Sequence, residues 1–402
     1  MGLAKTEWME AQERGWEAPE KSVCPDCVDD DHLKAVIRRS LTSLTCDYCG
    51  REEETEIAAA VEEIMPSVMG ALGHHFSSPE NAGVPYETAE GGWLIEPTDT
   101  QDALMSLPFD CNDQLFEDIS RAISDFNDAW VEAADGSWAG EHENARLIGG
   151  WNAFADHVKH RQRYFFTQTP DEECGPDIDP SRLLHALGDV VSRLALIQNI
   201  SANTVFFRVR AKQNADAWPK DKNNLAAPPP AKAAAGRMNP PGISYLYLAL
   251  EKPTAIAEVA LVPPCSFVIA QFTVDRDLTI LNLTNVPAIP SMFDHERLSE
   301  MELLLFLTAF TEKISQLVMK DGSEHVEYVP SQVVCEYFAS VFKRDGLSLD
   351  GILYPSAVRP GGRNLVLFPQ HDSAPDKFPE VNLQDATEVT AENWADLTNL
   401  LS

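Results

Sequence analysis

Hydrophobic residues in the first half of the chain recur at intervals of three and four positions, which is the period of an amphipathic helix. This pattern predicts helices over residues 56–72, 114–133, 144–166 and 181–200. The last of these helices follows Asp179-Pro180-Ser181, residue types that are typical of a helix start. The region from 56 to 200 is therefore predicted to be mostly α-helical.

Near residue 204 the pattern changes to short apolar runs that are rich in β-branched and aromatic residues and bounded by Pro, Gly and Asn. The predicted strands are 204–212, 243–250, 265–274, 278–283, 350–356 and 363–368. Two predicted helices, 296–315 and 330–346, interrupt them. The Pro/Ala-rich segment 224–236 is predicted to be a loop inside the domain, because strands resume directly after it. The whole pattern indicates an α+β fold class.

The length of 402 residues and the hydrophobic content of 44% are sufficient for more than one core. We expect four parts: a small cysteine-containing module at 1–55, a helical domain at 56–200, an α+β domain at 201–372, and a peripheral acidic tail at 373–402.

The formal net charge of −32 is unevenly distributed. Residues 201–372 hold 16 basic and 18 acidic side chains, which leaves 15 basic and 45 acidic ones for the rest. Such an acidic field repels phosphate backbones, so a nucleic-acid partner is not expected. The charge serves either solubility or an acidic interaction surface. The chain has no apolar run long enough to cross a membrane and begins with polar residues, so we expect a cytoplasmic protein.

Four of the eight cysteines form two pairs with metal-ligand spacing. Cys24 and Cys27 form one pair, Cys46 and Cys49 form the other, and a helix is predicted at 31–41 between them. Four thiolates can complete a tetrahedron around Zn²⁺ and leave no position for a substrate. The spacing therefore predicts a structural zinc site, with a redox pair or unligated thiols as alternatives.

Basic side chains gather where the strands begin. Residues 206–237 contain seven of them and only two acidic ones. They are Arg208, Arg210, Lys212, Lys220, Lys222, Lys232 and Arg237. This excess indicates either an anionic ligand or a solvated basic face, and an arginine on a strand could bind a pyrophosphate through its paired N–H groups.

An aromatic residue and a carboxylate follow. Tyr247 lies in a predicted strand, and Glu258 ends the segment Thr-Ala-Ile-Ala-Glu, which should form a short helix after Pro253. They could stack a planar base and stabilise a positive sugar centre. The pattern alone equally allows a core tyrosine and a surface acid.

Several of these segments, taken in order, resemble the RES family, named for its Arg, Glu and Ser. They are FFRVR, GRMNPPGISYLYLA, TAIAE and DGILYPSAVRPGGRNLVLF, within residues 204–370. The N-terminal cysteine pairs and WNAFADHVKHRQRYFF resemble the helical HEPN-like region fused to one RES subgroup. Met238 departs from the pattern, because many RES domains carry Trp there.

The resemblance implies an ADP-ribosyltransferase-like split β-sheet and an enzyme that acts on NAD⁺. By that resemblance, the catalytic residues are Arg208, Glu258 and Ser356, and NAD⁺ is bound by Arg208, Arg237, Tyr247 and Asn364. Glu258 would stabilise an oxocarbenium-like transition state while nicotinamide leaves. RES enzymes often have an antitoxin or another regulatory protein as a partner, and RES and HEPN modules commonly pair into oligomers.

Other functions remain open at this stage. The acceptor of the sugar could be water, phosphate or a protein side chain. A HEPN ribonuclease would require an Arg-x4–6-His motif, and the helical region offers only Arg182 with His185 and the group His157, His160, Arg161 and Arg163. A zinc adaptor without enzymatic activity is the other alternative.

Overall fold

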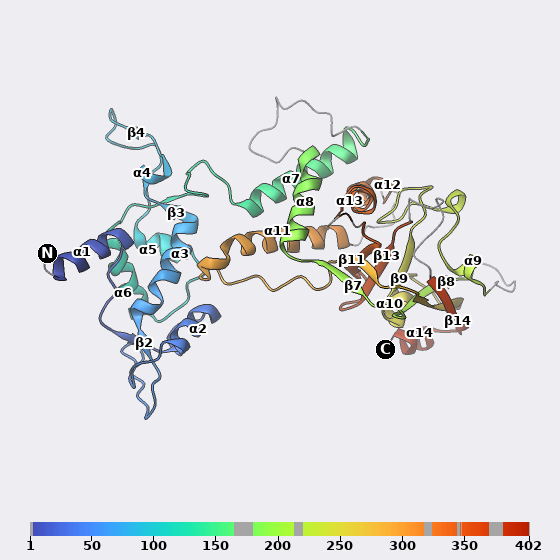
Figure 1. Cartoon of the computed structure of the whole chain (residues 1–402), viewed down its shortest axis with the longest axis horizontal. Coiled ribbons are helices and arrows are strands. Elements are labelled where there is room, and N and C mark those ends of the chain that lie inside the picture. The colour runs from blue at the N-terminus through green and yellow to red at the C-terminus, as the bar shows by residue number, and fades with distance from the viewer. Residues whose placement is uncertain are drawn as a thin grey trace. The chain divides into compact units, whose positions relative to one another are not determined.

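The computed structural model describes residues 3–164, 180–212, 220–316, 324–343, 346, 348–369 and 381–401 (Figure 1). They form two compact units. Unit 1 comprises Met1–Ala145 and Ala288–Glu302, and unit 2 comprises Arg146–Pro287 and Leu303–Ser402. The division into four parts stays a prediction.

Unit 1 consists of short helices and two-stranded β-ladders around one apolar core. In that core, Leu33 and Ile37 of α2, Met65 of α3 and Leu115 of α6 are fully buried. Its helices are α1 (Leu3–Arg14), η1 (Pro25–Cys27), α2 (Asp31–Arg39), η2 (Val61–Glu63), α3 (Met65–His75), α4 (Pro79–Ala82), α5 (Thr100–Met105), α6 (Asp113–Ser124) and η5 (His295–Arg297). Its strand pairs are β1 (Ser22–Val23) with β2 (Ala59–Ala60), β3 (Phe76–Ser77) with β6 (Val131–Glu132), and β4 (Tyr86–Glu87) with β5 (Gly92–Trp93).

The first three helices predicted in the region 56–200 are shorter than expected or begin later. The helix predicted from residue 56 begins at Met65, because Pro66 suits the first turn and Ala59–Ala60 pairs as a strand. The helix predicted over 114–133 ends at Ser124. The helix predicted over 144–166 ends at His160, and residues 165 and 166 lie outside the described residues.

A segment from the second half of the sequence belongs to unit 1. Phe293 is 1% exposed in the core of that unit, and the Ser291 hydroxyl donates a hydrogen bond to Asp30, 2.8 Å away. At Gly70 a Cβ would lie 2.4 Å from the His295 Cβ, so only glycine permits this contact. Sequence order alone could not predict this association.

Unit 2 is built on one mixed eight-stranded sheet, in the order β14-β10-β8-β9-β13-β12-β11-β7. The strands are β7 (Ile197–Ile200), β8 (Val205–Ala211), β9 (Leu246–Ala249), β10 (Cys265–Val274), β11 (Leu278–Asn282), β12 (Gly351–Pro355), β13 (Arg363–Leu367) and β14 (Val381–Ala391). The helices that lie wholly or mostly in this unit are α7 (Glu143–His160), α8 (Pro180–Arg193), α9 (Lys222–Leu225), η4 (Pro230–Lys232), α10 (Lys252–Ala257), α11 (Leu298–Ser315), α12 (Glu324–Glu327), α13 (Val329–Ser340) and α14 (Trp394–Leu401). The predicted α+β class is confirmed.

The two faces of this sheet are covered differently. Helices α7, α8, α11 and α13 bury one part of the first face, and α10 and α14 bury the part over β8 and β10. The second face carries a core formed mainly by the strands themselves. β8 and β9 share a single registered pair, Phe207 with Ala249. The hydrogen-bonded ladder between these two strands is therefore the shortest in the sheet.

Two strands were not predicted, and the first of them is β7. The helix expected over 181–200 begins at Pro180 and ends at Arg193, because Ala195 has a φ of 50°, and Ile197–Ile200 then pairs with β11. Asp179, the expected start of that helix, lies outside the described residues.

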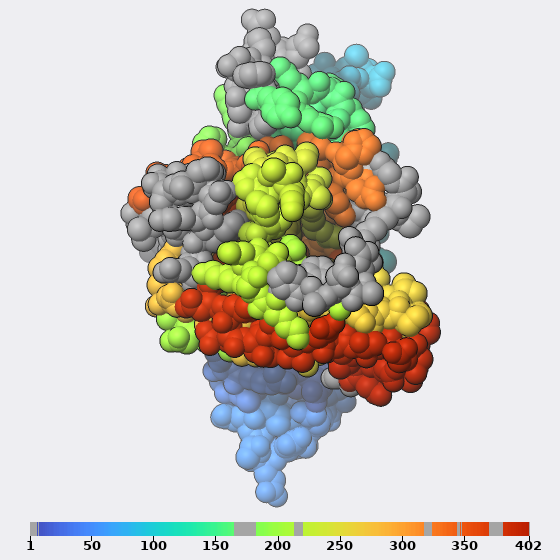
Figure 2. All heavy atoms as spheres, turned by 90° about the vertical axis from the view of Figure 1, so that its right-hand side faces the viewer, coloured from blue at the N-terminus to red at the C-terminus, as the bar shows by residue number. Residues whose placement is uncertain are grey.

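The second is β14, a strand within the segment that was expected to be a peripheral acidic tail. Val381–Ala391 pairs with β10 along its whole length, and Figure 2 shows β14 and α14 in red as a band across the visible face. An edge strand can expose one polar face to solvent, which is why this segment has an acidic sequence. Among the described residues, no helix is long and apolar enough to span a bilayer.

Candidate functional site

Glu258 lies at the C-terminal end of α10, where Ala255 and Ile256 are buried against the sheet. The residue is exposed, but its carboxylate has a fixed orientation. Oε1 accepts hydrogen bonds from the Ser356 hydroxyl at 2.7 Å and from the Asn364 side-chain nitrogen at 2.5 Å. Within the described part of the chain, no donor reaches Oε2. The carboxylate therefore keeps one oxygen available to a ligand.

Ser356 and Asn364 are themselves held by backbone contacts. Ser356 follows β12, and its hydroxyl oxygen accepts the N–H groups of Val358 at 3.3 Å and Arg359 at 3.1 Å. Asn364 lies in β13, opposite Ala249 of β9, and is 5% exposed. Two donors that lie 98 and 106 positions after Glu258 in the sequence thus converge on one of its oxygens. We name Glu258, Ser356 and Asn364 the carboxylate cluster.

Tyr247 is fixed by the loop that precedes its strand. Its hydroxyl donates to the Asn239 side-chain oxygen at 2.7 Å and accepts the Met238 N–H at 3.1 Å. Asn239 in turn donates to the carbonyls of Ala234, Pro240 and Ile243. Burial raises the pKa of Tyr247, so the phenol stays protonated at neutral pH.

The close packing around this phenol depends on a glycine. A Cβ at Gly236 would lie 2.5 Å from the Asn239 side-chain oxygen and 2.7 Å from the Tyr247 hydroxyl. Asn239 is not among the site residues predicted from the sequence. Its signal was the Asn-Pro-Pro-Gly turn directly after Arg237 and Met238.

Tyr354 interacts electrostatically with both Tyr247 and the carboxylate cluster. This buried residue of β12 lies opposite Asn364. Its pKa is raised first by burial and then by the charges of Tyr247 and Glu258, and it is lowered by Arg237. Tyr354 therefore lies within electrostatic range of three predicted site residues, although the sequence analysis did not select it.

The two arginines have different surroundings. The Arg237 guanidinium donates to the carbonyl of Ile314 at 3.0 Å. The Nη1 of Arg208 is buried and has no hydrogen-bond partner among the described residues. Burial, then Arg210, lowers the pKa of Arg208 to about 9, and Tyr247 acts in the opposite direction. An unpaired buried donor of this kind is costly unless a ligand satisfies it.

Strand register does not bring Arg208 directly to the carboxylate cluster. Arg208 lies opposite Ala270, a residue of the core on the second face, whereas Asn364 lies opposite Ala249 of the first face. Registered partners point to the same side of a sheet. Of the six predicted residues, the structure therefore places Glu258, Ser356 and Asn364 in contact, and it places Tyr247 within electrostatic range of Arg208 and Arg237.

The rest of the basic segment is partly neutralised. Lys212 and Lys220 lie 2.7 and 3.8 Å from the carboxylate of Glu388 in β14. The positive excess predicted from the sequence is thus reduced by a strand that the prediction left outside the domain.

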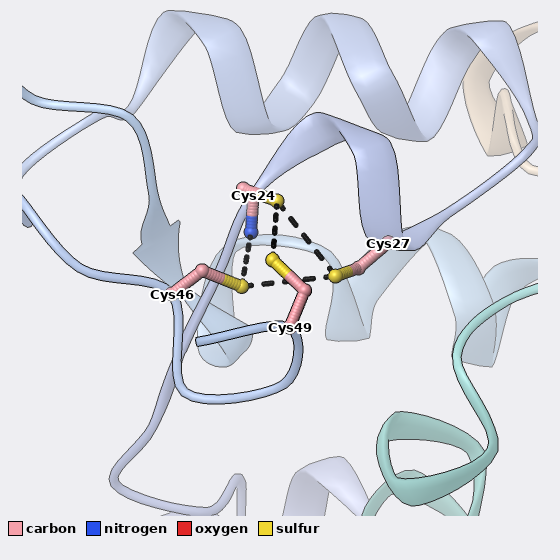
Figure 3. Close-up of side chains that lie close together, drawn as sticks. All are labelled: Cys24, Cys27, Cys46 and Cys49. Atoms are coloured by element: carbon pink, nitrogen blue, oxygen red, sulfur yellow. Dashed lines mark hydrogen bonds between the residues drawn. The ribbon is translucent and has the colours of Figure 1, made fainter. Parts of the chain in front are cut away.

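The four paired cysteines lie together in unit 1 and are named here the cysteine cluster (Figure 3). The Sγ–Sγ distances are 3.7 Å from Cys24 to Cys27, 3.6 Å from Cys24 to Cys49 and 3.7 Å from Cys27 to Cys46. Four sulfurs at about 2.3 Å from a tetrahedral zinc ion lie about 3.8 Å apart. The cluster therefore fits zinc in both donor type and spacing.

Backbone N–H groups favour the thiolate form of Cys46. A side-chain hydrogen bond fixes Tyr48, which lies between Cys46 and Cys49. Burial alone would raise the pKa of Cys46, but backbone N–H groups of Cys49, Tyr48 and Cys24 lower it to about 7. Between the cysteines of that pair, the Tyr48 hydroxyl donates to Asp118 of α6 at 3.1 Å. Lys21 also donates to Asp118, at 2.6 Å. The predicted helix between the pairs is confirmed as α2.

Two family models match the chain: HEPN/RES N-terminal domain 1 over residues 39–172, and the RES domain over residues 205–390. The chain contains a RES domain, preceded by a HEPN/RES N-terminal domain. The resemblance seen in the sequence is thereby confirmed, and the RES domain associates the chain with a family of NAD⁺-related toxins. No curated protein matches the chain.

The RES match includes every predicted NAD⁺-site residue and also β14. Met238, where many RES domains carry Trp, is 1% exposed, and its sulfur accepts the Cys335 thiol at 3.1 Å. This departure fills the core beside the Tyr247 loop and removes no member of the carboxylate cluster. The N-terminal match includes Cys46 and Cys49 and begins after Cys24 and Cys27.

Proposed function

We propose that the RES domain binds NAD⁺ and cleaves its nicotinamide–ribose bond. The observation that carries this proposal is the carboxylate cluster, which holds Glu258 by one oxygen and leaves the other available. The family match supports NAD⁺ as the substrate. The split of an ADP-ribosyltransferase-like sheet is proposed to lie between β8 and β9, where a single registered pair connects the strands.

The reaction needs little proton transfer at the leaving group. Nicotinamide is cationic in NAD⁺, so it leaves as a neutral molecule with the electron pair of the ribose C1′–N bond. The positive charge then develops on the ribose, as an oxocarbenium-like centre. An oriented carboxylate stabilises this charge more in the transition state than in the substrate, which is the condition for catalysis.

The other residues are assigned to binding and positioning. Ser356 and Asn364 fix Glu258, so that the carboxylate does not have to be reoriented during the reaction. The Tyr247 ring stacks on nicotinamide, since its hydroxyl is already engaged by Asn239 and Met238. Arg208 supplies its unpaired guanidinium to the phosphates, and Arg237 adds positive charge. A closed zinc site in the cysteine cluster would stabilise unit 1 and take no part in the chemistry.

Glu258→Gln tests the proposal, because it removes the charge and keeps the shape. We expect the rate of nicotinamide release to fall at least about a hundredfold, with NAD⁺ binding retained. Glu392→Gln is the matched control, since Glu392 is an exposed acid of the same unit. Full nicotinamide release by the Glu258→Gln protein would refute the assignment.

The same assay identifies the acceptor. Mass spectrometry of the products distinguishes free ADP-ribose from its 1-phosphate and from an ADP-ribosylated protein. The first two outcomes correspond to NAD⁺ depletion by hydrolysis or phosphorolysis. We propose depletion, because Glu258 is exposed and a small acceptor can reach its side of the sugar. A depleting enzyme also requires restraint in its host, for which an antitoxin or regulatory partner is proposed.

A further inference from the structure

Three histidines of unit 1 form a second cluster, remote in sequence from the RES motifs. His74 and His75 end α3, and His142 precedes α7. Their ring centroids lie 4.8, 4.5 and 4.6 Å apart, so each ring contacts both of the others. Each offers one ring nitrogen, and these three atoms lie within 4.8 Å of one another. Imidazole nitrogen is a preferred ligand of zinc and related metals.

A buried carboxylate lies beside two of the three rings and within hydrogen-bond distance of one of them. Glu302 is 4% exposed, and its Oε1 lies 2.9 Å from His74 Nε2 and 3.8 Å from His142 Nδ1. Its Oε2 accepts the Asn144 N–H at 3.0 Å. Metal-ligating histidines typically give their second ring nitrogen to a carboxylate in this way, which fixes the ring and its tautomer.

One ring nitrogen of the third histidine, His75, lacks a hydrogen-bond partner among the described residues. Nε2 of His75 is buried and makes no hydrogen bond in the described part of the chain. A buried polar atom without a partner is costly unless a ligand satisfies it. A metal ion bound at this nitrogen would satisfy it.

Two of the three histidines border a cavity of about 360 Å³. These are His75 and His142, which line it together with Ser106, Glu132 and Trp138. The cysteine cluster, in contrast, presents sulfur on all sides of its centre. Three protein ligands beside an open space are typical of catalytic zinc sites, where water or substrate takes the fourth position.

We propose that His74, His75 and His142 bind a zinc ion whose fourth coordination position faces this cavity. Glu302 holds His74 and His142 in place and is not itself a ligand. The fourth position takes water, hydroxide or a small anion. This site is independent of the function proposed for the RES domain, and its three imidazole ligands make it distinct in chemistry from the cysteine cluster.

Zinc content of the purified full-length chain tests the site. We expect wild type to carry one more zinc ion per chain than His75→Ala and His142→Ala, after dialysis against zinc-free buffer. His160→Ala is the matched control, since His160 is an exposed histidine outside the cluster. Equal zinc content in wild type and in both histidine variants would refute the proposal, whatever the cysteine cluster binds.

Amide circular dichroism shows whether each variant is folded, and His142→Gln, which keeps a polar side chain of similar length, replaces any variant that is not. Cobalt substitution then separates the two sites, because thiolate-bound cobalt has a near-ultraviolet charge-transfer band that imidazole-bound cobalt lacks. The histidine variants should keep this band and the visible bands of thiolate-bound cobalt, and they should lose only the weaker visible absorption of imidazole-bound cobalt. Azide should shift this weaker visible absorption in wild type. No shift would refute the open fourth position.

Discussion

The cysteine cluster of unit 1 and the carboxylate cluster of unit 2 are both built from polar side chains, but they differ in what they leave unsatisfied. The four cysteines present like ligands to a common centre, and three of them are buried. Glu258 is exposed and has two donors on one oxygen and none, within the described residues, on the other. A closed site can stabilise a fold, whereas an open one has capacity for a substrate.

The two clusters also differ in how the chain assembles them. The cysteines lie within 24–49, so local turns and one short helix bring them together. Glu258, Ser356 and Asn364 come from α10, the end of β12 and β13, and they meet only when the sheet has formed. Changes in the first cluster should therefore affect stability, and changes in the second should affect turnover.

The largest effect is expected for Cys27→Ser. Losing one of four thiolates should release the zinc and destabilise unit 1 by on the order of 5 kcal/mol, since structural zinc contributes directly to folding. Zinc content and urea unfolding measure this effect. Cys111→Ser is the control, as a cysteine of the same unit outside the cluster. An unchanged unfolding midpoint would show that the cluster is not a structural metal site.

The next largest effect is expected for Arg208→Ala. Charged hydrogen bonds contribute about 1.5–3 kcal/mol, so the KM for NAD⁺ should rise roughly ten- to a hundredfold while kcat changes little. Arg208→Lys keeps the charge and should recover part of the affinity. Because strand register places Arg208 on the second face of the sheet, the alternative is a structural role. A lower melting temperature with an unchanged KM would establish that alternative.

Periodicity was sufficient for most of the elements that carry these sites. It predicted α2, β8, β10, β12 and β13 because their apolar patterns are regular and local. It missed β14, since an edge strand with one solvated face reads as an acidic tail, and β7, since its residues continue the helical pattern of α8.

The site residues were less accessible to sequence reasoning. CxxC spacing alone indicated the cysteine cluster, because its members are close in sequence and chemically distinctive. Glu258 became a candidate only through the RES resemblance, since a lone acid after a short helix has many uses. Asn239 and Tyr354 were missed because their importance lies in contacts with Tyr247 and Asn364, which no local pattern encodes.

A smaller effect is expected for Asn364→Ala, which leaves Glu258 with one of its two donors. We expect kcat to fall about tenfold with little change in KM, since a hydrogen bond to an ionised carboxylate contributes about 1.5 kcal/mol or more. Asn364→Asp should reduce kcat further, because a second negative charge repels Glu258. Steady-state rates of nicotinamide release over a range of NAD⁺ concentrations separate kcat from KM. A change confined to KM would contradict a positioning role.

The smallest effect is expected for Tyr247→Phe. This change separates the structural role of the hydroxyl from the binding role proposed for the ring. Among the described residues, the hydroxyl binds Asn239 and Met238, so its loss should lower stability by about 1 kcal/mol. The ring remains available for stacking, and kcat/KM should change less than about threefold. Tyr247→Leu keeps apolar bulk and removes the aromatic ring, so it should weaken NAD⁺ binding by about 1 kcal/mol or more. Equal activity of the two variants would exclude stacking, and a large loss of kcat in Tyr247→Phe would place the hydroxyl in the chemistry.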